Sequence, residues 1–494
     1  MPERFNRAST LLKTGFPPKA RGNDKPMKWA SYLFGDSNHF AGNYFSSFVM
    51  AAILFKNALL VTLNPRREVQ RGDLLVREDR IVEMGQSILS EKIDRTIDAS
   101  RWAILPGFIQ THIHLCQTLF RNQAEDLSLL DWLRRRIWPF EAAHNEESMR
   151  LTTRLGIAEL LVGGTTTILD MGSVHHYDVV FDELEKWGLR AVGGKCMIDT
   201  GAGVPPGLLE KTANSLQESR QLYKTWHGAA NGRLRYAFAP RFSLSCTEPL
   251  LREVGTMARD LNCMIHTHAA ETAAEEEVLL QEKKYRSIDF FREMGIAGAH
   301  CCFAHGVQVN TREIKVLAQD RTGITHCPGS NAKLASGIAP ILKMRQAGVR
   351  LGLGADGAAC NNRLDIFAEM RLAGFLQKLQ HGATALSAQA IVEMATIDGA
   401  RCLNWDDEIG SLEAGKKADL VAINLDAPHA YPLQRENIYA QIVYAAKSSD
   451  VRLTMIDGRI CFENGEINHM DAGATLAVAE MEWKKLLQRA PIMG

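Results

Sequence analysis

Two histidines separated by one residue, His112 and His114, follow directly after the apolar run AILPGFI. Side chains alternate between the two faces of a β-strand, so both imidazoles point the same way where the predicted strand ends. Two imidazoles placed like this can bind one ion together. The alternative is a pair of surface histidines, and the rest of the chain decides between the two.

Further polar side chains stand at the ends of later apolar runs: His268 with Glu271, then His305, His326 and Asp356. Each has an ordinary structural alternative, since a histidine in an apolar run is commonly a core residue and an aspartate commonly caps a helix. The same position, however, carries a metal-binding or titratable group repeatedly. This recurrence favours one shared site over a series of unrelated residues.

Three neutral imidazoles and one carboxylate, with a position left open for water, are typical of a catalytic zinc site. The metal would lower the pKa of its bound water towards about 7 and make hydroxide available at neutral pH. We therefore predict one divalent ion, Zn²⁺ in the first place with Fe²⁺ or Mn²⁺ as alternatives. The predicted ligands are His112, His114, His268 and Asp356.

The remaining polar residues suggest the reaction. We predict that His305 hydrogen-bonds the hydroxide or the developing tetrahedral oxyanion, and that Asp356 carries the proton from nucleophile to leaving group. Glu271 lies three residues beyond His268, past the strand end, where it can reach the substrate. A carboxylic acid there can protonate a ring nitrogen beside the attacked carbon. This is the chemistry of hydrolytic deamination of an amino-heterocycle.

Other catalytic motifs do not fit. His144-Asn145-Glu146 matches the H-x-E of cytidine-deaminase zinc sites, but the P-C-x-x-C that should follow is missing from the sequence. The three residues precede a helical pattern and are better explained as a helix start. The sequence also contains no H-E-x-x-H, G-x-S-x-G or P-loop motif.

The elements that must position these residues alternate in type. Between Pro106 and Asn404, strand-like runs such as TTTILDM, RLRYAFAPRF and RLGLGAD alternate with helical patterns. Such alternation, about eight times in ~300 residues, predicts an α/β fold of the (β/α)8, TIM-like barrel type. An open doubly wound sheet has the same periodicity. The polar residues at successive strand ends favour the barrel, whose active sites are built there.

The two ends of the chain have a different sequence pattern. Short β-like runs in residues 50–105 and again in 405–468 predict one small β-sandwich domain built from both ends, with the barrel at 106–404 between them. Residues 469–494 are predicted as a C-terminal helix. Residues 1–49 are rich in Arg and Lys, and we interpret them as an N-terminal extension before a start at Met50, with a transit peptide as the alternative.

Composition bounds the class of protein. The formal net charge is +0, so long-range attraction to nucleic acid or to an anionic membrane is not expected. The apolar segment Phe45–Phe55 is too short to span a membrane. The ten cysteines contain no C-x-x-C pair, which argues for reduced thiols in a cytoplasmic protein.

The motifs resemble those of the amidohydrolase superfamily, in particular its single-metal aminohydrolase branch. The matching segments cover the chain from about Met50 to Glu466, and HLCQTLFR, SVHH and ADGAACNN are most similar to 5'-deoxyadenosine deaminases and methylthioadenosine/S-adenosylhomocysteine deaminases. The matching segments are PGFIQTHIHLCQTLFR, EDLSLLDWLRRRIWPFEA, GTTTILDM, HTHAAET, FAHGV, HCPGSNAKLASGIAPI, GADGAACNNRLDIFAEMR, MATIDGAR and IGSLEAGKKADLV.

The resemblance implies a barrel enzyme that converts an adenosine-type nucleoside to its inosine analogue and ammonia, and that assembles as a homo-oligomer, a dimer or a tetramer. It implies the same four metal ligands and Glu271 as the group that protonates the purine. Trp132 and Glu141 would line the nucleoside pocket, with Glu141 on the ribose hydroxyls. A core position is the alternative for Trp132.

Two positions depart from the family pattern. Where such deaminases usually present a substrate-binding histidine, FAPRFSLS offers Arg241, which we place among the substrate-binding residues and which changes the expected preference on the sugar side or at the 5' substituent. In HCPGSN, Gly329 stands where related sequences often carry Ser or Ala.

Two rival functions remain open at this point. The first is an enzyme of the same branch acting on another amino-heterocycle, such as an s-triazine amino- or chlorohydrolase or a guanine deaminase; a hydroxyl-binding acid at Glu141 favours the nucleoside. The second is a non-catalytic scaffold that keeps the barrel. Such a protein should have lost metal ligands, and none of the predicted set is missing.

Overall fold

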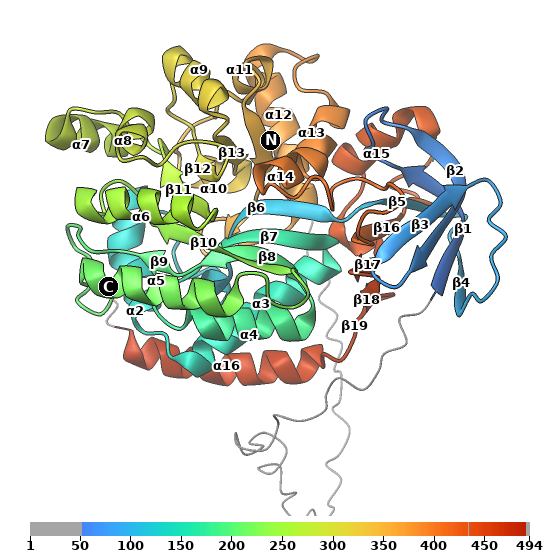
Figure 1. The fold of residues 1–494 in the computed structure, drawn as a ribbon, viewed down its shortest axis with the longest axis horizontal. Helices are drawn as coiled ribbons and strands as arrows, with labels where there is room; N and C mark the ends of the chain where they lie inside the picture. Colours follow the sequence, from blue (N-terminus) through green and yellow to red (C-terminus); the bar gives the residue numbers. More distant parts are fainter. Residues whose placement is uncertain (1–51, 433, 491–494) are drawn as a thin grey trace, which may run out of the picture. The chain divides into compact units, whose positions relative to one another are not determined.

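The computed structural model describes residues 52–432 and 434–490. The predicted extension at 1–49 and the start at Met50 lie outside these residues. In the part described, the barrel and a second sheet are distinct in Figure 1, with the strands of the second sheet drawn in blue and red. No helix among the described residues has the length and apolar character that crossing a membrane requires.

Eight parallel strands form a closed ring, because β10 pairs with both β8 and β11 and β14 pairs with β6. This confirms the predicted (β/α)8 barrel. Short strands β9 (Cys196–Met197) and β15 (Asp356–Gly357) extend it at β10 and β6. The ring strands are β6 (Phe108–His114), β7 (Thr165–Met171), β8 (Arg190–Gly194), β10 (Leu234–Pro240), β11 (Met264–Ala269), β12 (Cys301–His305), β13 (Gly323–His326) and β14 (Arg350–Leu353).

Helices connect successive strands of the ring. The longest connection follows β6 and begins with η1 (Leu115–Phe120). Three short helical turns come next, α1 (Leu129–Trp132), η2 (Leu133–Ile137) and α2 (Trp138–Ala142). The others are α3 (Glu146–Val162), α4 (Tyr177–Trp187), α5 (Thr212–Trp226), α6 (Glu248–Asp260), α7 (Ala273–Lys283), α8 (Ser287–Glu293), α9 (Thr311–Asp320), α10 (Pro328–Lys333), α11 (Ile341–Gln346), α12 (Ile366–His381), α13 (Ala388–Met394) and α14 (Ile397–Cys402).

Apolar side chains fill the interior of the barrel at the end opposite to the histidines. One apolar cluster contains a single residue from each of several barrel strands together with residues in and after α14, and Trp405 is its largest member. Close packing here leaves the carboxyl-terminal ends of the strands as the place for a site. The strand residues are Ile109, Leu169, Val192, Ala237, Met264 and Cys302.

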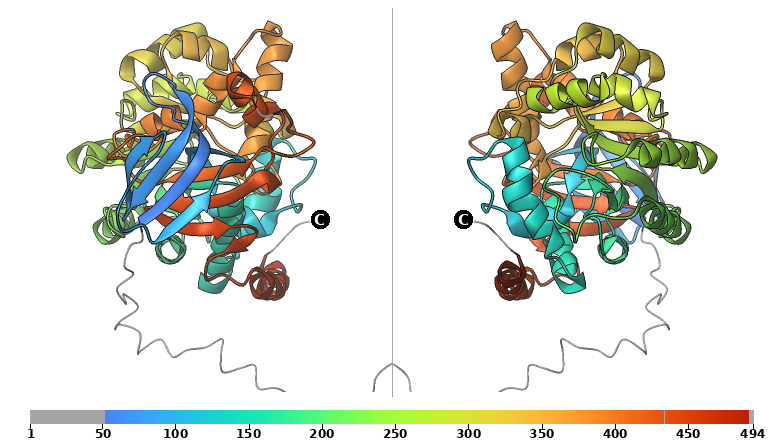
Figure 2. Two further views of the ribbon diagram at one scale, coloured as in Figure 1. Left: turned by 90° about the vertical axis from the view of Figure 1, so that its right-hand side faces the viewer. Right: turned by 90° about the vertical axis from the view of Figure 1, so that its left-hand side faces the viewer.

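The second sheet contains strands from both ends of the chain, as predicted. Strand β5 (Trp102–Pro106) pairs with β1 (Ala52–Val61) on one side and with β16 (Leu420–Asn424) on the other. Figure 2 shows these early and late strands side by side in the sheet. The other strands are β2 (Val69–Arg77), β3 (Arg80–Gly85), β4 (Arg95–Asp98), β17 (Val451–Ile456), β18 (Arg459–Glu463) and β19 (Glu466–Ile467).

The remaining elements belong to the C-terminal part of the chain. They are η3 (Arg435–Asn437), α15 (Ile438–Tyr444), η4 (Ser448–Asp450) and the last helix, α16 (Ala472–Arg489). We propose that the barrel and the sheet divide near residues 106 and 404, since the strands of the sheet all lie outside that range.

A buried ion pair joins the barrel to the sheet. Arg190, at the start of β8, donates two hydrogen bonds of 2.6 and 3.0 Å to Asp419 and a further one to Asp457. All three side chains are buried. Replacement of Arg190 by methionine would leave the buried Asp419 carboxylate without its guanidinium partner and would remove one of the cations beside Asp457. We therefore expect the free energy of unfolding to fall by about 3–5 kcal/mol, as measured by denaturant titration.

A surface pair provides the matched control. Arg95 and Glu463 also form a two-pronged ion pair, but the Arg95 side chain is 45% exposed. Arg95→Met should cost less than about 1 kcal/mol. Equal losses in the two variants would show that the Arg190 network adds no more than a surface ion pair.

Candidate metal and active site

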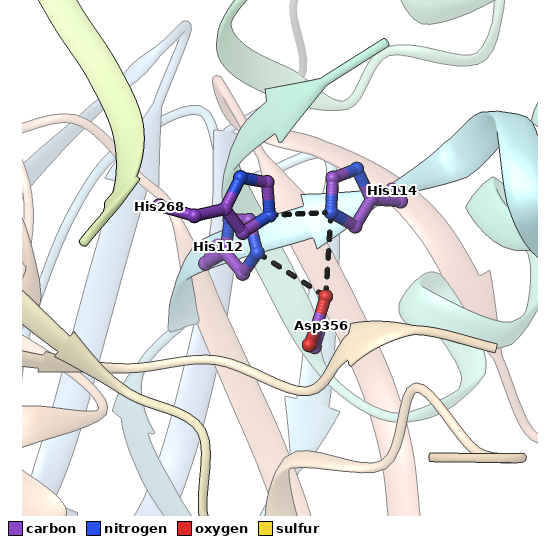
Figure 3. Close-up of side chains that lie close together, drawn as sticks. All are labelled: His112, His114, His268 and Asp356. Carbon is purple, nitrogen blue, oxygen red and sulfur yellow. Dashed lines mark hydrogen bonds and ion pairs between the residues drawn. The ribbon is translucent and has the colours of Figure 1, made fainter. Parts of the chain in front are cut away.

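Four side chains converge at the carboxyl-terminal end of the barrel. His112 and His114 lie on β6, His268 on β11 and Asp356 on β15, and their ligand atoms all lie within 4.8 Å of one another (Figure 3). Asp356 Oδ1 is 3.2 Å from His112 Nε2 and 3.3 Å from His114 Nε2. The structure therefore brings the four predicted ligands together.

Hydrogen bonds on the far side of two rings show which nitrogens face the centre. His114 Nδ1 donates to the carbonyl of Met171 at 2.8 Å, and His268 Nδ1 donates to the carbonyl of Arg241 at 2.7 Å. The two Nε2 atoms, 3.1 Å apart, then both carry lone pairs. Burial and the neighbouring His112 lower the pKa of His114 to about 3, so the ring is neutral.

The same centre contains an unsatisfied acceptor. His112 Nε2 is buried and has no hydrogen-bond partner among the described residues. Lone pairs of three imidazoles and a carboxylate that face each other are mutually repulsive unless a cation lies between them. A site of three nitrogens and one carboxylate oxygen fits a divalent transition metal such as zinc.

The backbone at two of the strand ends is strained. Asp356 has φ +62° and His305 has φ +75°, in the left-handed region that non-glycine residues rarely adopt. Although burial alone would raise it, the neighbouring His112 and His305 hold the pKa of Asp356 well below its usual range. Strain of this kind persists where the surrounding structure fixes a side chain for a task.

His305 and Glu271 lie together beside the four-residue cluster. His305 Nδ1 donates to Asn331 Oδ1 at 2.9 Å, so its Nε2 faces Glu271 Oε2 at 3.6 Å and Asp356 Oδ2 at 3.9 Å. Burial raises the pKa of Glu271 above its usual value. A carboxyl group here is suited to hold and donate a proton. The backbone N–H of Glu271 is held by the Glu275 carboxylate at 3.0 Å.

The pocket over this cluster has one apolar wall. The Trp132 indole lines it and its buried N–H has no partner among the described residues. The wall also contains the side chains of Leu129, Leu133, Phe242 and Leu334. Such a surface suits the flat, apolar face of a heterocycle.

The substrate-binding residues predicted from the sequence separate into two groups. Arg241 lines the pocket with Trp132, whereas Glu141 does not. The Glu141 carboxylate instead accepts a hydrogen bond of 2.7 Å from Arg241 and one of 3.0 Å from Gln117. Arg241 thus reaches the pocket as one half of a buried ion pair.

Three histidines show what sequence reasoning resolves and what it misses. His326 lies at the end of β13, but its buried ring does not line the pocket. His144 hydrogen-bonds Ser148 beside the cap of α3, as a helix-start residue should.

His266, not singled out from the sequence, donates to the Cys302 carbonyl and contacts His112. Its two-residue spacing from His268 was the available signal.

Gly329 has a packing reason that the sequence did not show. Its N–H donates to the buried carboxylate of Glu369 at 2.9 Å, and Glu369 also accepts from Asn361 at 2.8 Å. A Cβ at position 329 would lie 2.5 Å from Glu369 and 2.6 Å from Asn361. Both side chains would have to leave their hydrogen bonds to make room.

We therefore expect Gly329→Ala to lower the free energy of unfolding by about 1–3 kcal/mol, the usual cost of overpacking. Gly465, where an added Cβ would meet no atom within 4 Å, is not a suitable control because its φ is +98°. Gly85 is equally open and has no positive φ, so Gly85→Ala is the matched variant. Equal stabilities of the two variants would contradict the packing explanation.

Known proteins resemble this chain in sequence and in fold. Residues 103–461 match the model of the amidohydrolase family. The chain is 35% identical to 5-methylthioadenosine/S-adenosylhomocysteine deaminase of Thermoanaerobacter pseudethanolicus (88% of this chain, 100% of that protein) and 34% identical to 5'-deoxyadenosine deaminase of Methanosarcina acetivorans (89% and 100%). A crystal structure of an adenosine deaminase from Xanthomonas campestris with bound zinc superposes with a TM-score of 0.83 at 31% identity, covering 89% of this chain and 99% of that one.

Proposed function

The chain belongs to the amidohydrolase family, and from that premise we propose that it is a metal-dependent hydrolytic deaminase of adenosine-type nucleosides. Its substrate would be 5'-deoxyadenosine, methylthioadenosine, S-adenosylhomocysteine or adenosine, and its products the inosine analogue and ammonia. One observation carries the reaction class: a buried carboxyl group, Glu271, lines the same pocket as His114, His268 and Asp356 of the proposed metal site.

We propose that His112, His114, His268 and Asp356 hold one divalent ion, zinc before iron or manganese. When bound, such an ion would supply a hydroxide nucleophile at neutral pH, because it lowers the pKa of water to about 7. The support for zinc is the nitrogen-rich donor set together with the zinc in the similar deaminase structure.

The chain's own residues would then move the protons. Asp356 takes a proton from the attacking water and passes it to the departing amino group. Glu271, whose pKa is raised by burial, would donate a proton to the ring nitrogen beside the attacked carbon. His305 Nδ1 is hydrogen-bonded to Asn331, and when Nε2 also carries a hydrogen it would donate that hydrogen to the developing oxyanion. The proton left on the added hydroxyl would return to Glu271 as the C=O bond forms, so water supplies one proton to ammonia and one to Glu271.

For substrate binding we propose that Trp132 packs against the nucleoside and that Arg241 meets its sugar. Glu141 would act on the ribose hydroxyls through the arginine that it holds. We also propose a cytoplasmic homo-oligomer, a dimer or a tetramer. The buried state of all ten unpaired cysteines supports the compartment.

The test is ammonia release, with the accompanying ultraviolet change, from metal-loaded protein given 5'-deoxyadenosine, methylthioadenosine, S-adenosylhomocysteine, adenosine and guanine in parallel. Turnover of the adenosine analogues and not of guanine is the expected result. Turnover of guanine alone would overturn the nucleoside assignment. Silence on every compound with metal bound would overturn the deaminase itself.

A further inference from the structure

Two successive hydrogen bonds between barrel strands end at His112, one of the four clustered side chains. The carbonyl of Cys302 on β12 lies 2.8 Å from Nδ1 of His266 on β11. Nε2 of His266 lies 2.7 Å from Nδ1 of His112 on β6. The two imidazoles are fully buried and cross at 63° with their ring centres 4.8 Å apart.

The carbonyl of Cys302 determines which atom donates and which accepts in both hydrogen bonds. A carbonyl oxygen only accepts, so Nδ1 of His266 carries the hydrogen and its Nε2 carries the lone pair. That lone pair can be matched only by a hydrogen on Nδ1 of His112. His112 Nε2 is then left with a lone pair that faces the cluster, which is why it has no hydrogen-bond partner among the described residues.

We propose that His266 is a positioning residue that sets the tautomer of His112 and so keeps His112 Nε2 available to a metal ion. The inference rests on the proposed function in so far as that function needs a metal. It goes beyond it, because it assigns a task to a residue that is not one of the four proposed ligands and does not line the substrate pocket.

The competing tautomer shows why the cluster needs this partner. Without an acceptor at His266, the hydrogen on His112 Nδ1 would be buried and unpaired, which is unfavourable. Moving it to Nε2 would remove that cost, since Asp356 Oδ1 lies only 3.2 Å away to accept it. His112 and Asp356 would then bind each other through a proton, and a metal would have to displace that proton before either could act as a ligand.

The test compares His266→Met with His266→Gln. Methionine fills the space and offers only a weakly accepting sulfur. Glutamine offers an amide oxygen to His112 and an amide N–H to the Cys302 carbonyl, so it can restore both hydrogen bonds. Metal affinity is measured on metal-free protein by zinc titration against a chromogenic chelator, and unfolding is measured on the same metal-free samples.

We expect methionine to weaken zinc binding about 10–100-fold and glutamine to recover most of the loss. His227→Leu is the matched control: its ring also accepts one hydrogen bond, from the Tyr236 N–H, and lies outside the pocket lining. That variant should bind zinc like the wild type. His266→Leu is made in parallel, so that one non-accepting variant remains if the other fails to fold.

The outcomes separate the inference from the proposed function. Wild-type zinc affinity in a folded methionine or leucine variant would overturn the role of His266 and leave the deaminase proposal intact. Equal loss of affinity in the methionine and glutamine variants would also overturn it, because packing alone would then explain the residue. A wild-type protein that binds no zinc would instead refute the metal assignment itself.

Discussion

Replacement of Glu271 by glutamine is expected to lower kcat about 10²–10⁴-fold while the metal content stays at the wild-type level. Glutamine keeps the shape of the side chain but has no acidic proton to give to the purine ring. Glu271 is not one of the four clustered ligands, so the metal should be unaffected. Metal analysis and steady-state kinetics on the same preparation measure both quantities.

The matched control for this change lies on the next helix. Glu276 is also a buried glutamate, but its carboxylate accepts from the Ser287 N–H and pairs with Arg286. Glu276→Gln should keep kcat within a few-fold of the wild type. Substantial activity in Glu271→Gln would remove this residue as the ring-nitrogen acid, whereas a parallel loss of metal would show that it belongs to the metal site.

The second large effect is expected for Asp356→Asn, which should lose both zinc affinity and rate. The amide removes the only negative charge in the cluster and can direct an N–H at the lone pairs of His112 and His114. It also removes the base that accepts a proton from water, so we expect kcat to fall about 10²–10⁴-fold even at saturating zinc. A zinc titration and a rate measurement at excess zinc separate the two losses.

Asp365 offers the corresponding Asp→Asn control nine positions further along the chain. It caps α12 by accepting from the Phe367 N–H, and asparagine caps helices equally well. Asp365→Asn should therefore bind zinc and turn over normally. If Asp356→Asn reached the wild-type rate once zinc was in excess, Asp356 would be a ligand only and its part in proton transfer would be wrong.

The sequence predicted the barrel and its cluster because both follow from short-range rules. Alternation along a strand places His112 and His114 on one face, and parallel strands of a barrel end on the same side. Together these rules bring His268 and Asp356 to the same place across more than a hundred residues. No knowledge of individual contacts is needed for that step.

What the sequence could not predict are the pairings between side chains of different elements. Arg241 and Glu141 are 100 positions apart, and neither spacing nor residue type shows that each satisfies the other. Gly329 looked like an ordinary loop change until the buried Glu369 was placed beside it. In each case the deciding fact is which polar group remains unsatisfied after burial, and that depends on the packed structure.

The sheet built from both ends of the chain has a consequence for biosynthesis. On the ribosome, β5 is made early and can pair with β1, but its other edge meets its partner only when residues 420–424 have been translated. Until then the nascent chain presents an apolar strand edge of the kind that recruits foreign strands. Protection by a chaperone matters most in that interval. A chain truncated before β16 would keep this edge of β5 unpaired and prone to aggregation.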